Sequence, residues 1–597
     1  MKEYASPIAV AEPTSGNLTD YLWTNERDFP DSVVFSRRGS GGWSDVTSRQ
    51  FAEEVRALAA GFVASGVQVG DRVGLMSRTR YEWAVADFAI WTAGGITVPI
   101  YETSSAEQVE WILSDSGAVA VIVENDGHAE TVASVAGKLS DLRHTWAIDR
   151  GDLDKLVEQG KGVARADLDA RHGALTPETL ATIIYTSGTT GRPKGCELTH
   201  GNFMFDVSST TEGLNEFYNE AGSTLLFLPL AHVFGRIIQL GSVANRVRVG
   251  HTADVKNLLP DLAAFQPTFL LSVPRVFEKV YNASRQKAHA DGKGKIFDAA
   301  ERVAIAYSEA LDKGGAGLGL KVQHKVFDKL VFSKLRAALG GKVEYCVSGG
   351  APLGARLGHF FRGIGVTILE GYGLTETSAG STLNLPGQMK VGTVGRAIPG
   401  TTVRIAEDGE ILLKGAQIFT GYYKNAKATA EAIDPDGWFH TGDIGTLDAD
   451  GFLTITGRKK ELIVTAGGKN VAPAVLEDRL RAHPLVSQCI VVGDNKPFIG
   501  CLVTIDPEAF PAWKSEHGKP EGASVADLAD DPDLRAEVQG AVDQANKAVS
   551  KAEAIKSFRI LPVDFTEESG HMTPSLKVKR AVVLNDFARE VEAIYAS

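Results

Sequence analysis

The sequence predicts an α/β protein in which a large amino-terminal domain, residues 1–459, precedes a small α+β domain, residues 460–597. From Thr47, helix-like and strand-like segments alternate, which is typical of helices layered on a largely parallel sheet. From Val403 the pattern changes to short strands and turns, and a basic break at 458–461 precedes a new helix and strand pattern. We therefore place the domain boundary between Lys459 and Lys460.

Composition indicates a globular protein. The chain has 597 residues, 44% hydrophobic and 23% charged, which is ordinary for this class. A formal net charge of −12 argues against broad nucleic-acid binding, although a local basic patch can still dock on a membrane. The four cysteines form no C-x-x-C pair, so reduced thiols in a cytoplasmic protein are expected. We expect neither a signal peptide nor a membrane span, so any membrane contact would be peripheral.

The large domain is predicted to begin with a helix capped at Thr47 and Gln50. Its further strands are expected at Arg72–Met76, Ile96–Tyr101, Ala118–Val123, Thr224–Leu228, Thr268–Val273, Val343–Val347 and Val366–Leu369, with helices at Tyr81–Thr92 and Ala106–Ser114. The stretch 276–342 is mostly helical and is expected to be an amphipathic cover for the sheet. Asp408-Gly409 and Asp450-Gly451 predict hairpin turns.

The small domain is predicted from its own alternation of patterns. We expect helices at Pro473–Ala482, Asp533–Ala552 and Arg580–Ala596, with strands at Gln488–Val492 and Gly500–Ile505.

The central motif is the stretch 182–200, which reads TIIYTSGTTGRPKGCELTH. Its first four residues are β-branched or aromatic and predict a buried strand that ends at a loop. The loop combines hydroxyl groups, glycines and a lysine, which suits a phosphate chain because backbone N–H groups can turn inward. A flexible surface loop is the alternative, and the spacing is not that of a P-loop. The candidate phosphate-binding residues are Thr186, Ser187, Gly188, Thr189, Thr190 and Lys194.

Two further motifs follow predicted strands. The first, VSGGAPL at 347–353, contains Gly349, Gly350 and Ala351 and would let a flat ligand approach the backbone, although SGG is also an ordinary turn. The second, EGYGLTETS at 370–378, offers an aromatic ring for a purine, a hydroxyl for phosphate and a carboxylate for Mg²⁺. A buried strand end with a stray carboxylate is the alternative. The candidates here are Tyr372, Gly373, Thr375 and Glu376.

Two segments near the boundary and the carboxyl end carry further candidates. In WFHTGD at 438–443, Asp443 could accept both ribose hydroxyls while Arg458 donates to the same sugar. Asp after Gly is also a common turn residue. In TPSLKVKR at 573–580, Lys577 and Lys579 need no role beyond solvation.

A lone histidine, His232, lies in LPLAHVFGR at 228–236. A hydrogen-bonded structural histidine and a residue beside an acyl carboxylate are both consistent with this position. Arg236 lies one turn later on the same helix face.

Taken together, these motifs resemble the adenylate-forming superfamily, which contains acyl-CoA synthetases, luciferases and the adenylation domains of peptide synthetases. The segments PIYETSSAEQ (99–108), LPLAHVFGR and SVPRVFEKVY (272–281) look like the bacterial long-chain fatty acyl-CoA synthetases. The resemblance covers nearly the whole chain. It implies layered α/β subdomains, a distorted β-barrel and a mobile carboxyl-terminal lid that is hinged at Lys460.

The resemblance also implies residue roles. Tyr372 and the 349–351 segment would border adenine, Thr375 the α-phosphate and Glu376 the metal ion. Asp443 and Arg458 would bind ribose, and Gly467 and Gly468 would pass the pantetheine arm of CoA. Lys577, three positions before an arginine, would be the catalytic lysine. Many relatives have glycine where this chain has Leu576, so Lys579 stays the alternative.

The activity implied is ATP- and Mg²⁺-dependent conversion of a long-chain fatty acid to acyl-AMP, and then to acyl-CoA. A ligase that passes acyl-AMP to a carrier protein would share every ATP motif, and a non-catalytic homologue that binds lipid or acyl-adenylate is an alternative from another class. Partners would be the fatty acid, ATP and CoA, with no nucleic acid, and the protein would be a monomer or homodimer. Acyl-chain length depends on tunnel depth, which periodicity does not measure.

Overall fold

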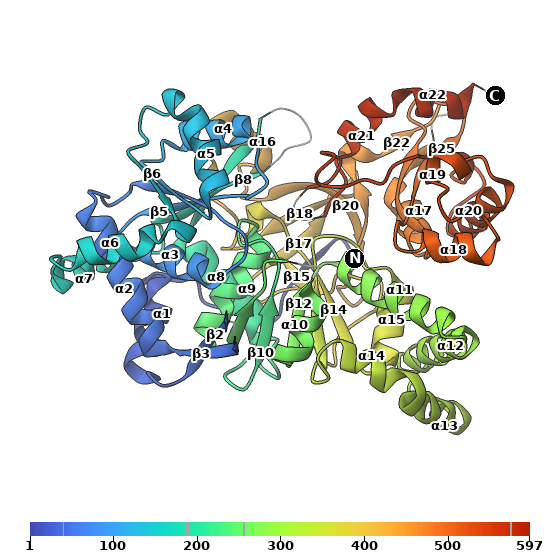
Figure 1. Ribbon diagram of the computed structural model, residues 1–597, viewed down its shortest axis with the longest axis horizontal. Helices are drawn as coiled ribbons and strands as arrows, with labels where there is room; N and C mark the ends of the chain where they lie inside the picture. The colour runs from blue at the N-terminus through green and yellow to red at the C-terminus, as the bar shows by residue number, and fades with distance from the viewer. Residues whose placement is uncertain (40, 187–191, 255–256, 467–468, 574–575, 597) are drawn as a thin grey trace.

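The structure is a computed structural model, and it describes residues 1–39, 41–186, 192–254, 257–466, 469–573 and 576–596 (Figure 1). Its larger part, blue through yellow to light orange in Figure 1, consists of three layered sheets with helices and a further antiparallel sheet. A smaller unit, orange to red, lies beside it. The predicted fold class is confirmed: an α/β protein with a large amino-terminal part and a small α+β carboxyl-terminal part.

The first sheet has seven strands in the order β19-β9-β8-β5-β4-β6-β7. Its strands β4, β5, β6, β7 and β8 are parallel, and β9 returns antiparallel to β8. The strands are β4 (Arg72–Met76), β5 (Ile96–Ile100), β6 (Ala120–Val123), β7 (His144–Ala147), β8 (Leu180–Thr186), β9 (Lys194–Thr199) and β19 (Gly421–Tyr422). Its helices include α2 (Ser48–Ala64), α3 (Tyr81–Thr92), α4 (Ala106–Ser116), α5 (Asp126–Val135), α6 (Asp152–Gly160), α7 (Arg165–Gly173) and α8 (His200–Glu212). The predicted capping box of Thr47 and Gln50 begins α2.

Two further sheets place loops at the carboxyl ends of parallel strands. One has the order β10-β11-β2-β3 and the other β12-β13-β14-β15-β16. The strands are β2 (Val33–Gly39), β3 (Gly42–Thr47), β10 (Ser223–Leu226), β11 (Arg248–His251), β12 (Phe269–Ser272), β13 (Tyr345–Ser348), β14 (Thr367–Tyr372), β15 (Thr382–Leu383) and β16 (Arg396–Ala397). The helices are α1 (Thr19–Asp28), α9 (Val233–Ala244), α10 (Leu258–Phe265), α11 (Pro274–Ala290), α12 (Gly294–Leu311), α13 (Leu318–Phe327), α14 (Ser333–Ala338) and α15 (Ala355–Gly363).

The distorted barrel is present as a half-barrel of five antiparallel strands, in the order β1-β17-β18-β20-β21. Its strands are β1 (Glu3–Ala5), β17 (Thr402–Ile405), β18 (Glu410–Lys414), β20 (Phe439–Leu447) and β21 (Leu453–Arg458), with α16 (Ala426–Ala432) before β20. Both predicted hairpin turns lie between the expected strands, at Asp408-Gly409 and Asp450-Gly451.

The smaller unit has a two-stranded sheet and a three-stranded sheet. Its elements are β22 (Ile463–Val464), β23 (Asn470–Val471), α17 (Pro473–Arg481), β24 (Val486–Val492), β25 (Ile499–Ile505), α18 (Phe510–Glu516), α19 (Val525–Leu528), α20 (Pro532–Asn546), β26 (Ile555–Ile560), α21 (Arg580–Asp586) and α22 (Ala588–Tyr595). Buried apolar residues form separate clusters, two between Leu18 and Leu453 and two between Ile463 and Ile594. The division between residues 459 and 460 stays a prediction.

Several elements differ from the sequence prediction. The single helix expected at 580–596 is two helices, because Phe587 leaves helical geometry (φ −107°, ψ 30°) where its ring packs against Phe565 and His571. Helix α20 ends at Asn546 instead of 552. The hairpin β2–β3 and strand β1 were not predicted. Helix α13 has no buried residue, so it is not the cover for the sheet that we expected of this stretch.

Candidate active site

Strands β8 and β9 position the two described ends of the glycine-rich loop. Thr186 is paired with Lys194 in the β8–β9 register. The Trp111 indole N–H donates to the Pro193 carbonyl at 2.9 Å, and the Arg192 guanidinium lies 4.8 Å from the Trp111 ring centroid. The exit of the loop is therefore fixed against α4. The predicted residues Ser187, Gly188, Thr189 and Thr190 lie outside the described residues.

Tyr422 brings Lys194 and Glu376 together, and sequence reasoning missed it. Its hydroxyl donates to Glu376 Oε1 at 2.8 Å, and Lys194 Nζ lies 4.9 Å from its ring centroid. Burial, and then the Glu376 charge, raises the pKa of Tyr422, so the phenol stays a donor. Tyr422 reaches this place because β19 pairs with β9, which places Tyr422 opposite Cys196. No local pattern in the sequence signals that pairing.

Tyr372, Asp443 and Arg458 form a connected group. The Tyr372 hydroxyl donates to Asp443 Oδ2 at 2.6 Å, and Arg458 Nε lies 3.1 Å from Asp443 Oδ1. Asp443 and Arg458 are cross-strand partners of β20 and β21, so the hairpin itself sets their spacing. A Cβ on Gly373 would stand 1.6 Å from the Ala379 carbonyl oxygen, so the turn after Tyr372 requires glycine. The two residues expected to bind ribose, Asp443 and Arg458, therefore lie together beside Tyr372, the residue expected to border adenine.

The start of α9 faces the glycines that follow β13. His232 Nδ1 accepts a hydrogen bond from the Phe234 N–H at 3.1 Å, so His232 caps the helix. Burial, and then the nearby Lys577 charge, lowers the pKa of His232 to about 3, which leaves a neutral ring with its proton on Nε2 at pH 7. A Cβ on Gly349 would lie 3.5 Å from the Phe234 ring. Gly350 has φ of 83°, a conformation that suits glycine.

Lys577 comes from the smaller unit and reaches this group. A Cβ on Gly350 would stand 4.0 Å from Lys577 Cε. Burial, and then the Arg458 charge, lowers the pKa of Lys577, whereas Asp443 and Glu376 act in the opposite direction. The residue before it, Leu576, has φ of 61°, a left-handed conformation that glycine adopts without cost.

The other cations of the same segment have different surroundings. Arg580 donates to the Val491 carbonyl oxygen at 2.8 Å and forms an ion pair with Glu477, both within the smaller unit. Among the contacts of the described residues, none brings the Lys579 side chain to the group around Gly350. The geometry therefore favours Lys577 over Lys579.

The remaining predicted residues are half-buried, exposed or outside the described residues. Thr375 begins the 3₁₀ turn Thr375–Thr377 and is half-buried, next to Glu376. Ala351 is exposed. Lys460 is exposed in the 3₁₀ turn Lys459–Glu461, and the Lys459 ammonium binds Asp408 at 2.6 Å and Glu410 at 3.0 Å. Gly467 and Gly468 lie outside the described residues.

A buried ion pair supports α9 from behind. Arg236 Nε lies 2.9 Å from Asp87 Oδ2, and both side chains are fully buried. Arg236 also donates to the Thr182 hydroxyl at 2.6 Å, on strand β8. Trp83, Trp91 and Phe203 surround the guanidinium. One turn of α9 thus joins His232 at the site to a pair fixed by α3 and β8.

The smaller unit docks on α11 and α15 through polar contacts. Arg275 lies 3.2 Å from the Ser487 hydroxyl and 3.7 Å from Asp506. Arg356 donates to the Ala482 carbonyl oxygen at 3.2 Å. Glu370 accepts from the Leu353 N–H at 3.2 Å, and burial, with a contribution from Asp478 across the contact, raises its pKa to about 7.

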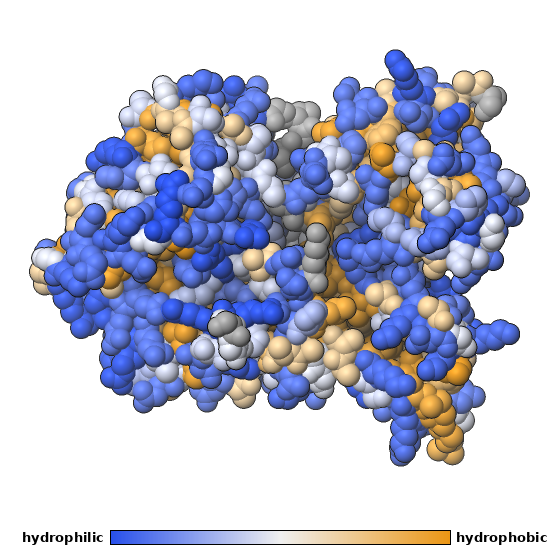
Figure 2. Space-filling view, viewed as in Figure 1, coloured by the Kyte–Doolittle hydropathy of each residue, from blue (hydrophilic) through white to orange (hydrophobic). Residues whose placement is uncertain are grey.

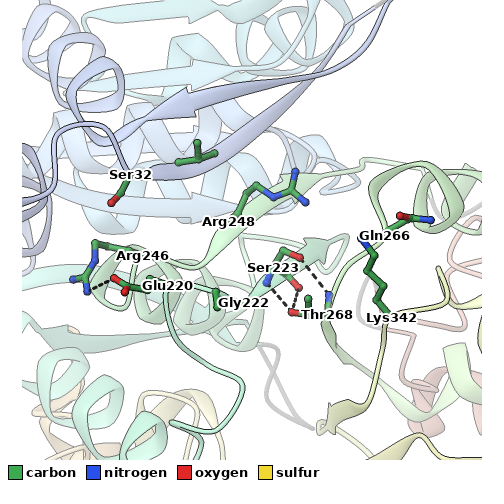
Figure 3. A pocket seen from close by; sticks show the side chains of 11 residues that line it. Ser32, Glu220, Gly222, Ser223, Arg246, Arg248, Gln266, Thr268 and Lys342 are labelled. Carbon is green, nitrogen blue, oxygen red and sulfur yellow. Dashed lines mark hydrogen bonds and ion pairs between the residues drawn. The ribbon is translucent and has the colours of Figure 1, made fainter.

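Three of the predicted groups, at Thr186, at 349–351 and at 372–376, lie at the carboxyl ends of β8, β13 and β14, the usual ligand edge of α/β sheets. A pocket of about 540 Å³ lies instead at the amino ends of β10, β11 and β12 (Figure 3). Its lining includes Ser223, Thr268 and Arg248, and it contains none of the predicted site residues. The pocket is therefore separate from the candidate active site.

Comparisons with known proteins find relatives that match nearly the whole chain. The chain is 56% identical to the long-chain-fatty-acid--CoA ligase FadD15 of Mycobacterium bovis over all of both chains. It is 32% identical to long chain acyl-CoA synthetase 7, peroxisomal, of Arabidopsis thaliana, covering 93% of this chain and 82% of that protein.

Solved structures share the fold. The anthranilate CoA ligase AuaEII in complex with anthranoyl-AMP superposes with a TM-score of 0.73 at 20% identity, over 97% of this chain and 98% of that one. The A domain of carboxylic acid reductase from Segniliparus rugosus gives 0.74 at 21% identity, over 97% and 94%. Residues 22–423 match the AMP-binding enzyme family, and residues 460–597 match the AMP-binding enzyme C-terminal domain. The chain therefore belongs to the AMP-binding enzyme family.

Proposed function

We propose that this protein is an ATP- and Mg²⁺-dependent long-chain-fatty-acid--CoA ligase. It would form acyl-AMP and pyrophosphate from a fatty acid and ATP, and then acyl-CoA and AMP. The observation that carries this proposal is the meeting of Lys577 with the Asp443–Arg458 pair and Gly350, because cation, ribose acceptor and open backbone are what an adenylate requires. The names of the full-length relatives supply the acyl and thiol substrates.

In the first step the fatty carboxylate attacks the α-phosphorus of ATP and pyrophosphate leaves. A carboxylic acid is already ionised at pH 7, so no general base is needed. The barrier is repulsion between anions, which Lys577, Lys194 and the N–H groups of the 186–195 loop would offset. The neutral His232 would donate Nε2–H to the fatty carboxylate and hold it in line.

The nucleoside would be held by the group on β14, β20 and β21. Asp443 would accept the ribose hydroxyls, in place of the hydrogen bond it now accepts from Tyr372, while Arg458 donates to the same sugar. The Tyr372 ring and the 349–351 backbone would flank the adenine, and Thr375 would contact the α-phosphate. Gly373 would keep the turn between them narrow.

Glu376 would hold a Mg²⁺ ion. Its Oε1 accepts from Tyr422, and in the described part of the chain no bond to protein is made by Oε2. One carboxylate is what Mg²⁺ uses when phosphate and water supply the other ligands, and the described residues contain no cluster of three acidic, histidine or cysteine ligands. The ion would neutralise charge on the phosphates.

For the second step we propose that residues 460–597 act as a lid that turns about Lys460. The turn would withdraw Lys577 and bring Gly467 and Gly468 to the pantetheine arm of CoA. The CoA thiolate would then attack the acyl carbonyl and AMP would leave. We place the enzyme in the cytoplasm as a monomer or homodimer, with peripheral membrane contact.

The test is AMP formation from ATP and Mg²⁺ with fatty acids of increasing length, with and without CoA, while acyl-CoA is followed by mass spectrometry. Sustained turnover only with CoA, strongest on long chains, is expected. Bound acyl-AMP that CoA cannot discharge would identify a carrier-protein ligase. Absence of any adenylate would identify a binding protein instead.

A further inference from the structure

An exposed apolar stripe runs along α13 and the turn after it. Leu318, Val322, Val326 and Leu330 recur every four residues and are 84%, 64%, 51% and 52% exposed. Residues at this spacing share one face of a helix. Helix α13 projects at the lower right of Figure 1, and Figure 2 shows hydrophobic residues gathered at the same tip. Contiguous exposed apolar surface of this kind marks an interaction site.

The opposite face of α13 already anchors the helix to the protein. The His324 ring stacks on Tyr307 of α12 with centroids 3.9 Å apart, and His324 Nε2 lies 2.6 Å from the Gly363 carbonyl oxygen of α15. Phe332, in the π-helical turn Asp328–Phe332, is fully buried. The contacts that hold α13 to the protein therefore do not use the exposed apolar stripe.

Lysines accompany the stripe. Lys321, Lys325 and Lys329 immediately precede Val322, Val326 and Leu330, and all three lysines are exposed. Residues 313–336 contain six basic residues against one acidic residue, in a chain of net charge −12.

Two carboxylates near these lysines in the sequence are paired with arginines. Asp328 binds Arg336 at 2.7 Å, and Asp312 binds Arg362 at 2.8 Å. In the part of the chain that the structure describes, none of the three lysines has a carboxylate within ion-pairing distance. The lysines are therefore available to an anionic surface.

The surface that matches both features is an anionic phospholipid bilayer. Apolar side chains can enter the acyl boundary while neighbouring lysines extend to the phosphates. A second copy of the chain fits less well, because a symmetric contact would set the lysines against the same lysines. The described helices include none long and apolar enough to cross a bilayer, so this contact would be in the plane of the interface.

We propose that α13 and the turn to Leu330 dock the protein on anionic phospholipid membranes. The benefit to catalysis rests on the proposed function, because long-chain fatty acids partition into bilayers. Docking itself needs neither ATP nor CoA. Vesicle binding and acyl-CoA synthesis can therefore fail independently. Failure to bind vesicles would contradict the docking proposal, and failure to form acyl-CoA would contradict the proposed function.

The test is flotation of the full chain with vesicles of equimolar phosphatidylglycerol and phosphatidylcholine, compared with phosphatidylcholine alone. We expect binding to the anionic vesicles that weakens as salt rises. Each lysine near such a surface contributes about fivefold, so the triple variant Lys321→Glu, Lys325→Glu, Lys329→Glu should bind at least ~100-fold more weakly. The matched control is Lys138→Glu, Lys161→Glu, Lys427→Glu, which changes the net charge equally at exposed sites elsewhere.

A second pair of variants tests the apolar part. Val322→Ser with Val326→Ser should weaken binding about tenfold, whereas Val69→Ser with Val563→Ser, also exposed, should not. Thermal unfolding and turnover of a short water-soluble acid report whether each variant is folded. Equal loss in the two triple variants, or no binding by the wild type, would overturn the proposal. A wild-type dimer that the α13 variants dissociate would assign the stripe to a second copy.

Discussion

The two sides of the candidate site are built differently. On the large side, hairpin register spaces Asp443 and Arg458, and the Arg236–Asp87 pair holds α9 behind His232. On the small side, Lys577 lies in an irregular segment between β26 and α21, and its unit has a separate apolar core. This difference fits the proposed mechanism, in which the fixed half binds and orients the substrates and the smaller unit, joined to it by polar contacts, would turn away between the two chemical steps.

The largest effect is expected on the fixed half. Arg236→Met leaves the fully buried Asp87 carboxylate without its cation and should lower the free energy of unfolding by about 3–5 kcal/mol. Chemical denaturation measures it, with Arg143→Met as the control, because Arg143 pairs with Asp71 at the surface. Adding Asp87→Leu to Arg236→Met should recover part of the loss. If the single variant were as stable as wild type, α9 would not depend on this pair.

The small half should be catalytic without being structural. Lys577→Ala should slow acyl-AMP formation by about 10²–10³-fold, because a cation near the transferred phosphate is lost, with little change in melting temperature. Transfer of the acyl group from supplied acyl-AMP to CoA should be nearly unchanged. Lys579→Ala is the matched control, and a greater loss in that variant would transfer the catalytic role to Lys579.

The contact between the halves should weaken at high pH. Burial raises the pKa of Glu370 and of Asp478 to about 7, well above the values near 4 of an unfolded chain. The folded form therefore holds these protons more tightly. The stabilisation that these two protonated carboxyls give the folded form is complete below about pH 4, and it is lost as the pH rises through about 7. From these two groups, melting temperature should fall as the pH rises from about 4 to about 7, and level off above about pH 8.

Glu370→Gln should make the fall in melting temperature shallower, because the glutamine amide does not titrate. Its oxygen can still accept from the Leu353 N–H, so the hydrogen bond is kept. Glu309→Gln, at an exposed position, is the control. An unchanged pH profile in Glu370→Gln would assign the effect to other groups.

The smallest effect is expected next to the catalytic candidate. Leu576 adopts φ of 61°, so Leu576→Gly relieves strain of about 1–2 kcal/mol but makes the unfolded chain more flexible. The net change in stability should stay within about 1 kcal/mol, and acyl-AMP formation should change by about twofold or less. Leu576→Val should be more harmful, because branched residues resist this conformation. A large loss in Leu576→Gly would show that the leucine side chain itself holds Lys577.

Local sequence patterns account for what could be predicted. Long-range packing accounts for what could not. The strand Arg72–Met76 and the helix Tyr81–Thr92 have the predicted ends, because strong periodicity specifies them. The residues of the nucleotide motifs could be named, because glycines, hydroxyls and charges at fixed spacing belong to local turns. Tyr422 could not be found, because its place depends on β19 pairing with β9, more than two hundred residues away in the chain.

Packing also explains the other differences. Phe587 breaks the last predicted helix because it fits between Phe565 and His571, which lie earlier in the chain. The exposure of Val322 and Val326 depends on where α12 and α15 hold the opposite face of α13. A helical pattern alone does not distinguish an apolar face that meets the core from one that meets the surroundings.

All four cysteines of the sequence are buried and unpaired, and burial raises the pKa of the Cys196 and Cys346 thiols. Thiol–disulfide exchange requires an accessible thiolate. The thiol substrate, CoA, therefore meets no exposed cysteine of the enzyme with which it could form a mixed disulfide. Oxidised CoA should therefore leave the enzyme unmodified, and a cysteine introduced at its surface would be the sole target of thiol reagents.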